Sequence, residues 1–302
     1  MLTAFLSRAD VSRHLQALHL LKELRDALTA RRKSTSVRTL RFEPTAPWSS
    51  TLVRQAALAE VPAWMVTVRA ETTKGARTVL QLHDPATGQL LAMMDAGHLM
   101  MLRASLMSAL AADVLSRPDA KNVAVVGAGP AASSALKALR LVRSIERVWM
   151  HEPNVADNFE LAHRLQTTLS MAISAVDTPQ EAVADADVVV LTGKVSLEGV
   201  SFKPGAHVTV LAAETFVSPP LPSAAFLEAR RFCDASEPAL EWGAPFSELG
   251  EVLSGEKPGR QAKGELTLFA SIGPAALDLL AAWHVYEGAR HDEGLTRIDL
   301  EA

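Results

Sequence analysis

Apolar positions in the first third of the chain follow two different periods. Leucines recur three or four residues apart after Ser7–Asp10, which has the composition of a helix capping box, and this spacing predicts an amphipathic helix that ends near Arg31. Strands are predicted at residues 37–42, 64–69, 78–82 and 89–94. The last two flank the turn sequence Asp84–Gly88 and are expected to form a hairpin, before a long apolar helix over residues 99–116.

The pattern changes after Pro118 and Asp119, where short apolar runs begin to alternate with helical segments. Val123–Val126 is a continuous apolar run of the kind found in parallel strands that are buried on both faces. Further strands are predicted at residues 147–151, 188–191, 207–211 and 230–234, and helices at residues 131–143 and 155–169. Strands that alternate with helices predict βαβ units, and therefore a parallel sheet.

The two patterns together predict an α/β protein with two domains. One domain is a doubly wound parallel sheet over residues 118–273. Beyond the alternating section lies a helix predicted over residues 274–289, which we expect to return to the first part of the chain. The second domain is therefore expected to be α+β and to be formed from both chain ends, residues 1–117 and 274–302.

Composition restricts the class of protein. The 302 residues are 48% hydrophobic and 21% charged, which suits two domains with sizeable cores. A net charge of −4, with no dense basic cluster beyond Arg31–Lys33, argues against nucleic acid as a partner. Cys233 is the single cysteine, so no internal disulfide forms, as is typical of the reducing cytoplasm. We find neither a signal peptide nor an apolar window of about 18 residues, so no membrane segment is expected.

A glycine motif provides the strongest chemical signal. It runs Gly127-x-Gly129-x-x-Ala132, between a predicted strand and a predicted helix. The first glycine allows a tight turn, the second lets the backbone approach a pyrophosphate, and the small third residue permits close packing of helix on strand. The helix start then presents unpaired N–H groups to the phosphates. The motif predicts a dinucleotide-binding Rossmann domain, the alternative being a glycine turn without a ligand; the expected contacts are Gly127, Ala128, Gly129, Pro130 and Ala131.

An acidic residue ends the next predicted strand and bears on the choice of cofactor. Glu152 can accept hydrogen bonds from the ribose hydroxyls of the adenosine, and its charge would repel a 2′-phosphate. We therefore expect NAD(H) to be preferred over NADP(H), with Pro153 as a neighbouring contact. The alternative for Glu152 is an ordinary surface acid.

Two stretches of sequence resemble a known family. Residues 94–105, which lead to the glycine loop, and residues 265–279, with the turn Phe269–Gly273, resemble ornithine cyclodeaminases and mu-crystallins, as does Pro258–Arg260. The resemblance covers nearly the whole chain. It implies a nicotinamide cofactor in the Rossmann domain, and a second domain that holds the substrate and pairs two subunits into a homodimer. Family activities include ornithine cyclodeamination, alanine dehydrogenation and the reduction of cyclic imines or ketimines.

The resemblance also implies roles for individual residues. Arg38 matches the arginine that grips the substrate carboxylate, and Arg103 matches a second arginine between cofactor and substrate. For both arginines the alternative is a surface ion pair. Thr78 falls where the family often has a hydroxyl that lines the pocket. The contacts implied for the nicotinamide side of the cofactor are Leu191, Thr192, Gly193, Ser271 and Ile272.

Three positions depart from the family pattern. Trp64 stands where the family has a lysine that assists carboxylate binding and proton transfer, and an indole offers only a donor N–H. Ala104 replaces a threonine that often follows the second arginine. Glu214 replaces the catalytic aspartate of cyclodeaminases; it can still move a proton near a substrate amine, the alternative being a solvated loop acid.

These observations predict an NAD(H)-dependent oxidoreductase of amino acid metabolism. Hydride transfer is expected between the nicotinamide and the α-carbon of a small amino or imino acid, with Arg38, Arg103, Thr78 and Trp64 facing the substrate and Glu214 as proton carrier. Reduction of a protonated imine needs less proton transfer than cyclodeamination, which favours a cyclic imine or ketimine reductase or an amino acid dehydrogenase. Two alternatives remain: ornithine cyclodeaminase proper, and an NAD-binding homologue with impaired catalysis. No metal is expected.

Overall fold

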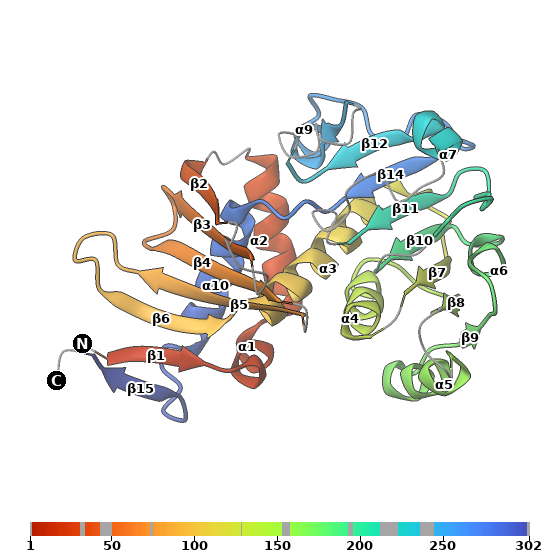
Figure 1. Cartoon of the computed structure of the whole chain (residues 1–302). Helices are drawn as coiled ribbons and strands as arrows, with labels where there is room; N and C mark the ends of the chain where they lie inside the picture. Colours follow the sequence, from red (N-terminus) through yellow and green to blue (C-terminus); the bar gives the residue numbers. More distant parts are fainter. Residues whose placement is uncertain are drawn as a thin grey trace. The chain divides into compact units, whose positions relative to one another are not determined.

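The chain folds into two compact units. The computed structural model describes residues 2–30, 34–42, 50–72, 75–127, 129–152, 158–192, 196–211, 223–235 and 245–300. Unit 1 consists of residues 1–27, 32–103 and 274–302, and unit 2 of residues 28–31 and 104–273 (Figure 1). The division falls within a helix, after Arg103, whereas the sequence suggested a boundary after residue 117. The predicted α/β fold is confirmed.

Unit 1 is built on one seven-stranded sheet with the order β15-β1-β6-β5-β4-β3-β2. Its strands are β1 (Leu2–Leu6), β2 (Ser34–Phe42), β3 (Ser50–Leu58), β4 (Trp64–Thr72), β5 (Gly75–His83), β6 (Leu90–Asp95) and β15 (Thr296–Asp299). Its helices are α1 (Arg8–His14), α2 (Ala17–Thr29), the first part of α3 (Ala96–Leu115) and α10 (Ala275–Ala289). Because β15 pairs with β1, both ends of the chain contribute to this sheet.

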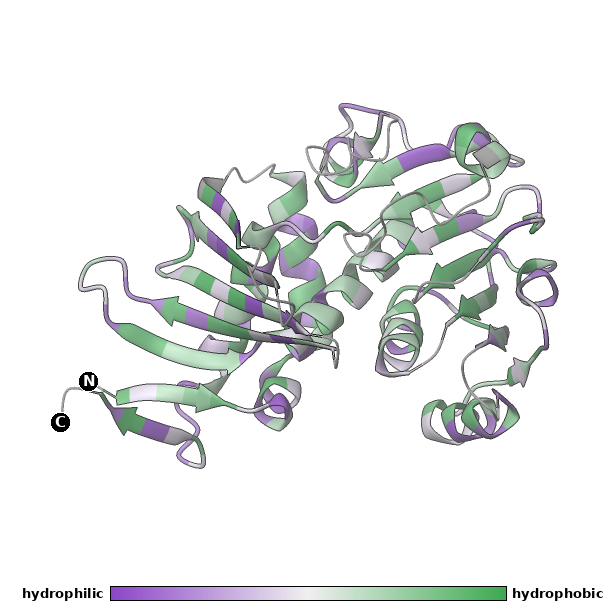
Figure 2. Cartoon of the chain, viewed as in Figure 1, coloured by the Kyte–Doolittle hydropathy of each residue, from purple (hydrophilic) through white to green (hydrophobic). Residues whose placement is uncertain are grey.

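The two faces of this sheet differ in burial. One face carries Met65, Leu80 and Leu82, which are fully buried, and α10 packs against it along β3; we call it the helix-covered face. The second face carries Leu40, Phe42, Val68 and Val79, whose side chains are exposed. Figure 2 shows bands of differing hydropathy along β4 and β5, whose successive side chains point to opposite faces. Strand register thus decides on which face a candidate residue lies.

The predicted first helix is two helices. Its start is confirmed: Ser7 accepts from the N–H of Asp10 and Asp10 from that of Ser7, a complete capping box. Leu15, however, has an extended backbone and ends α1. The N–H of Gln16 donates to Nε2 of His284 on α10 at 3.2 Å, so a tertiary contact takes the place of continued helical bonding. A spacing pattern within the helix cannot reveal such a contact.

Helix α3 corrects the expectation that no long apolar window exists. Its 20 residues are long and apolar enough to cross a membrane by composition alone. However, 67% of that window is buried inside the structure, as in the core helix of a soluble protein, and one such helix is weak evidence for a membrane span.

Unit 2 contains an eight-stranded parallel sheet with the order β13-β12-β14-β11-β10-β7-β8-β9. The strands are β7 (Asn122–Val126), β8 (Arg147–His151), β9 (Ile173–Ala175), β10 (Val188–Leu191), β11 (His207–Val210), β12 (Arg230–Cys233), β13 (Ser247–Glu248) and β14 (Thr267–Ala270). The helices are α4 (Pro130–Leu139), α5 (Asn158–Leu169), α6 (Pro179–Val183), α7 (Ser223–Glu228) and α9 (Leu249–Leu253). The strand order reverses between β7 and β10, and ligands of such sheets bind outside the carboxyl ends at this switch point.

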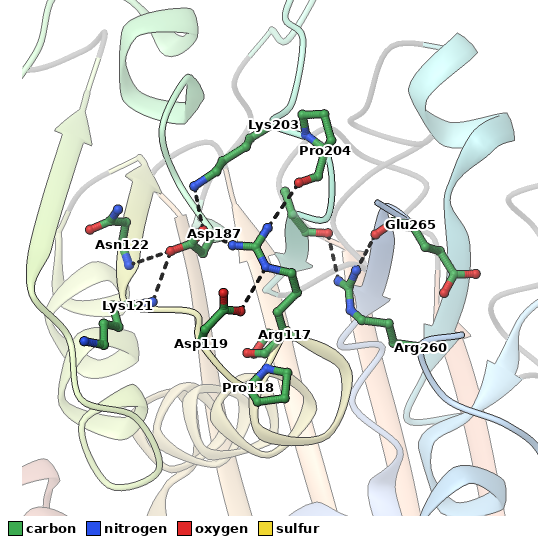
Figure 3. Close-up of polar contacts among 12 residues, drawn as sticks. Arg117, Pro118, Asp119, Lys121, Asn122, Asp187, Lys203, Pro204, Arg260 and Glu265 are labelled. Carbon is green, nitrogen blue, oxygen red and sulfur yellow. Dashed lines mark hydrogen bonds and ion pairs between the residues drawn. The ribbon is translucent and has the colours of Figure 1, made fainter. Parts of the chain in front are cut away.

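A buried polar network ties together the opposite, amino-terminal edge of this sheet (Figure 3). The carboxylate of Asp187 accepts from Arg117 at 2.6 Å, from Lys203 at 2.8 Å, and from the N–H groups of Lys121 and Asn122 at 3.1 Å. Burial acts to raise the pKa of Asp187, but the hydrogen bonds from Lys203, Lys121 and Asn122 and the charge of Lys203 outweigh it and hold the pKa below its usual range. The network fixes the starts of β7 and β10.

Arg260 belongs to the same edge and has a structural role. Its guanidinium donates to the carbonyls of Leu115 at 2.7 Å and Ala206 at 3.1 Å, and to Oγ1 of Thr267 at 2.8 Å. It also donates to the carbonyl of Glu265 (Figure 3). The sequence Pro258–Arg260, which contributed to the family resemblance, therefore joins α3 to the starts of β11 and β14.

His207 makes this edge sensitive to acid. Burial, with the positive charges of Arg260 and Arg143, lowers the pKa of His207 to about 3. In the unfolded chain a histidine has a pKa of about 6.5. Below that pH the unfolded chain binds a proton that the folded protein does not, so the free energy of unfolding is highest above about pH 6.5 and decreases as the pH falls toward 3. We expect acidification from about pH 7.5 to about pH 5 to remove about 2 kcal/mol of unfolding free energy through His207.

Urea unfolding of the wild type and of His207→Asn at both pH values measures how much unfolding free energy each protein loses on acidification. The variant starts less stable, because it alters a buried bonded side chain, but its unfolding free energy should fall less on acidification. Equal losses in the two proteins would contradict the assignment.

Candidate functional site

The glycine loop of unit 2 has the geometry that a phosphate site requires. Gly127 has φ 105° and donates its N–H to the carbonyl of His151 at 2.8 Å. Gly129 has φ 82° and ψ −162°, a backbone region adopted essentially by glycine alone. It precedes α4, whose first residue is Pro130, and provides no side-chain cap. A Cβ added at Gly129 would meet no described atom within 4 Å, so an incoming group can approach this backbone closely.

The predicted adenosine contact lies beside this loop. Glu152 follows β8 directly, and β8 pairs with β7 in a parallel register that places His151 opposite Val126. The loop after Val126 and the carboxylate of Glu152 therefore extend from adjacent strand ends. Ala131 lies in the first turn of α4. Ala128 and Pro153 lie outside the described residues.

The predicted nicotinamide contacts lie at the carboxyl ends of other strands in the same sheet. Leu191 ends β10 and is buried, and Thr192 donates its N–H to the carbonyl of Val126 at 3.0 Å. Ser271 and Ile272 follow β14. Because all these strands are parallel, the structure brings the predicted cofactor residues to one edge of the sheet. Gly193 and Glu214 are not among the residues that the structure describes.

Arg103 of unit 1 is held by a buried carboxylate. Its Nε and Nη2 lie 3.0 and 2.9 Å from a single carboxylate oxygen, Oδ1 of Asp278 on α10. Asp278 is fully buried, and its Oδ2 lies 3.4 Å from Nη2 of Arg54 on β3. One carboxylate thus positions two guanidinium groups, and the pairing fixes the orientation of Arg103.

Arg38 lies on the second face of the unit 1 sheet. It is exposed and pairs with Gln55, which in turn pairs with Val66. Arg54 occupies the next position of β3 and therefore points to the helix-covered face. Within unit 1 the structure groups Arg103 with Arg54 through Asp278, and it does not bring Arg38 to that cluster.

Trp64 and Thr78 occupy different surroundings in unit 1. Trp64 lies on the second face, and its ring stacks on His83 at 4.3 Å between centroids with 12° between planes. An aromatic stack therefore stands at the position where the resemblance led us to expect a lysine. Thr78 lines a cavity of about 590 Å³, together with Arg8, Arg77 and Asp95.

The sequence analysis missed Arg54 and Asp278, and also Asp234, whose side chain accepts from the N–H of Ile272 at 2.7 Å. Asp278 is an acid in an otherwise apolar helical stretch, and a buried charge of that kind requires a partner, so its sequence context was a usable signal. Arg54 gives no such signal, because its role depends on strand register. Asp234 comes directly after the apolar end of β12.

A second cluster of titratable side chains has the residue types of a metal site. His19, Glu23 and His284 have ligand atoms within 4.8 Å of one another. Nε2 of His284 accepts from the N–H of Gln16, so the ring proton lies on Nδ1. Nδ1 then donates to the carboxylate of Glu23 at 2.9 Å. Burial lowers the pKa of His284, although Glu23 acts to raise it. A metal needs a lone pair on that nitrogen, so the geometry favours a hydrogen-bonded link between α2 and α10.

Comparison with known sequences finds one family and several of its members. The family model described as "Ornithine cyclodeaminase/mu-crystallin family" matches residues 3–293. A Delta(1)-pyrroline-2-carboxylate reductase of Bacillus cereus is 30% identical over 247 residues, which cover 74% of this chain and 76% of that protein. The ketimine reductase mu-crystallin of Mus musculus is 32% identical over 218 residues, covering 68% and 67%.

Solved structures show the same fold. The Thermococcus litoralis Delta(1)-pyrroline-2-carboxylate reductase, in complex with NADH and L-proline, matches with a TM-score of 0.84 at 22% identity, covering 98% of this chain and 100% of that chain. An archaeal alanine dehydrogenase dimer with bound NAD matches with a TM-score of 0.81 at 22% identity, covering 99% and 100%.

Proposed function

Because the chain belongs to the ornithine cyclodeaminase/mu-crystallin family, we propose that it is an NAD(H)-dependent oxidoreductase that acts on a small amino or imino acid. The reaction is the reduction of a cyclic imine or ketimine, or the dehydrogenation of an amino acid. The glycine loop carries this proposal, because two glycines at positive φ precede α4 at the switch point of the sheet. The reductases among its relatives support a C=N substrate.

In this scheme the residues of the chain bind the substrate and orient it toward the cofactor. When bound, a nicotinamide dinucleotide supplies or accepts the hydride. Arg103, oriented by Asp278, holds the substrate carboxylate and so fixes the α-carbon for transfer. Arg38 lies on the other face of the unit 1 sheet from the Arg103 cluster, so its role as a carboxylate contact rests on the family resemblance alone, as does the role of Glu214 as proton carrier. A protonated imine that gains a hydride at carbon becomes an amine without a further proton, which suits a chain with Trp64 in place of the lysine.

The direct test mixes the purified protein with NADH and a panel of cyclic imines, or of 2-oxo acids with amines, and follows NADH absorbance. We expect oxidation of NADH with at least one imine that carries a carboxylate. Release of ammonia from ornithine in the presence of NAD would instead identify ornithine cyclodeaminase.

The Trp64–His83 stack favours one rival, a homologue that binds NAD(H) without catalysis. Fluorescence of bound NADH with no oxidation across the panel would support it.

Substitutions separate the roles of substrate binding and proton transfer. Arg38→Ala should mainly raise KM, because it removes a contact to the carboxylate. Glu214→Gln should mainly lower kcat, by about 10²–10⁴-fold, because it removes a positioned proton carrier. Arg41→Ala, on the same strand but the opposite face, is the matched control for Arg38. Unchanged kinetics in both variants would remove these roles.

Glu152 is proposed to set the preference for NAD(H). Its carboxylate should repel the 2′-phosphate of NADPH, so NADH is expected to bind at least about tenfold more tightly. Glu152→Gln should narrow that ratio by strengthening NADPH binding, whereas Glu160→Gln, on an exposed part of α5, should leave it unchanged. Equal affinities of the wild type for NADH and NADPH in a fluorescence titration would contradict the role.

We further propose that two copies form a homodimer, in the cytoplasm, through the second face of the unit 1 sheet. Exposed Leu40, Phe42, Val68 and Val79 give this face an apolar character that a monomer rarely presents to water. A related archaeal alanine dehydrogenase is described as a dimer. Sedimentation of Val68→Asp as a monomer, beside a wild-type dimer, would support this interface.

A further inference from the structure

A buried carboxylate holds the turn that follows β14. Asp234 lies at the carboxyl end of β12, is only 5% exposed, and follows Cys233, which pairs with Ala270. Its Oδ1 accepts from the N–H of Ile272 at 2.7 Å, and both of its oxygens lie 3.2 Å from the N–H of Gly273. Oδ2 also accepts from the hydroxyl of Ser271 at 3.2 Å. One side chain thus bonds to three successive residues.

These bonds determine what the turn can offer to a ligand. The N–H of Ser271 donates to the carbonyl of Val210 at 3.0 Å, so the N–H groups of Ser271, Ile272 and Gly273 are all engaged within unit 2. Gly273 also has φ 81°, where glycine is favoured. The turn is therefore fixed in shape by bonds within unit 2.

We propose that Asp234 is a positioning residue for the nicotinamide half of the cofactor. It acts by holding the shape of the Ser271–Gly273 turn, which contains the proposed nicotinamide contacts Ser271 and Ile272. This inference rests on the proposed function, since it requires that a nicotinamide dinucleotide binds at the carboxyl edge of the sheet. The adenosine end has its own contacts at Gly129 and Glu152, on other strands. Loss of Asp234 should consequently affect one end of the cofactor and not the other.

The experiment compares two ligands that differ only in the nicotinamide ring. Calorimetric titration gives the Kd of NADH and of ADP-ribose for wild type and for Asp234→Asn. The asparagine keeps one acceptor oxygen but replaces the other with an NH₂ that cannot accept the N–H of Gly273 or the hydroxyl of Ser271. We expect the Kd of NADH to rise at least about tenfold and that of ADP-ribose to stay within about twofold.

Asp187→Asn is the matched control. Asp187 is equally buried, bonds to several donors and belongs to the same sheet, but it lies at the opposite edge. Its replacement should lower stability and leave the ratio of the two Kd values unchanged. If Asp234→Asn does not fold, Asp234→Glu, which keeps the charge but moves it by one methylene, provides the same comparison.

The outcomes are distinct. A selective loss of NADH affinity supports the role of Asp234. Equal changes for both ligands, or no change, would overturn it and leave a purely structural carboxylate. A wild-type protein that binds neither ligand would overturn the proposed function, and this inference with it.

Discussion

Gly129→Ala is expected to raise the Kd for NADH by about 100-fold, corresponding to about 2.7 kcal/mol. Gly129 adopts φ 82° and ψ −162°, where a residue with a Cβ is strained by about 1–3 kcal/mol. The added methyl group would also stand where the backbone must approach the diphosphate. Fluorescence titration with NADH measures the effect.

The control for this change is another glycine of unit 2. Gly264 lies outside the positive-φ positions, and a Cβ there meets no described atom within 4 Å. Gly264→Ala should therefore bind NADH within about twofold of wild type. Normal binding by Gly129→Ala would show that the loop does not hold the diphosphate.

Asp278→Ala should lower the free energy of unfolding by about 3–5 kcal/mol. The substitution leaves Arg103, with a side chain only 3% exposed, and Arg54, 14% exposed, without the carboxylate that now lies between them. Urea unfolding followed by circular dichroism measures the loss. The same variant should raise KM for the substrate, because Arg103 is no longer oriented.

An exposed ion pair serves as the control for Asp278. Glu146 pairs with Lys121 at 2.6 Å, but both side chains are more than half exposed. Glu146→Ala should cost less than about 1 kcal/mol. A similar small cost for Asp278→Ala would mean that the buried pair is not a main support of unit 1.

The features that could be predicted from the sequence are local. Val123–Val126 is apolar at every position because β7 is buried on both faces, and Figure 2 shows β7 as almost uniformly hydrophobic. Gly127 and Gly129 are required by backbone angles at their own positions. Cys233 is the small buried residue that a lone cysteine suggests, and burial, with the charge of Asp234, raises the pKa of its thiol.

The features that could not be predicted depend on contacts between distant segments. Strands β1, β3, β9, β13, β14 and β15 were missed, and β15 pairs with β1 from the other end of the chain. The bond from Gln16 to His284, which accompanies the break between α1 and α2, joins residues far apart in sequence. Strand register places Arg38 on one face and Arg54 on the other. Register depends on pairing across the sheet, which a single strand sequence does not specify.

The pairing of β15 with β1 has a practical consequence for engineering. Leu2 lies opposite Asp299, so the two termini run side by side in antiparallel strands (Figure 1). A short peptide linker could join them, and new ends could open at the exposed turn Asp84–Gly88. Such a circular permutant would keep every strand of the sheet. The C-terminal segment of unit 1, residues 274–302, would then run directly into its N-terminal segment.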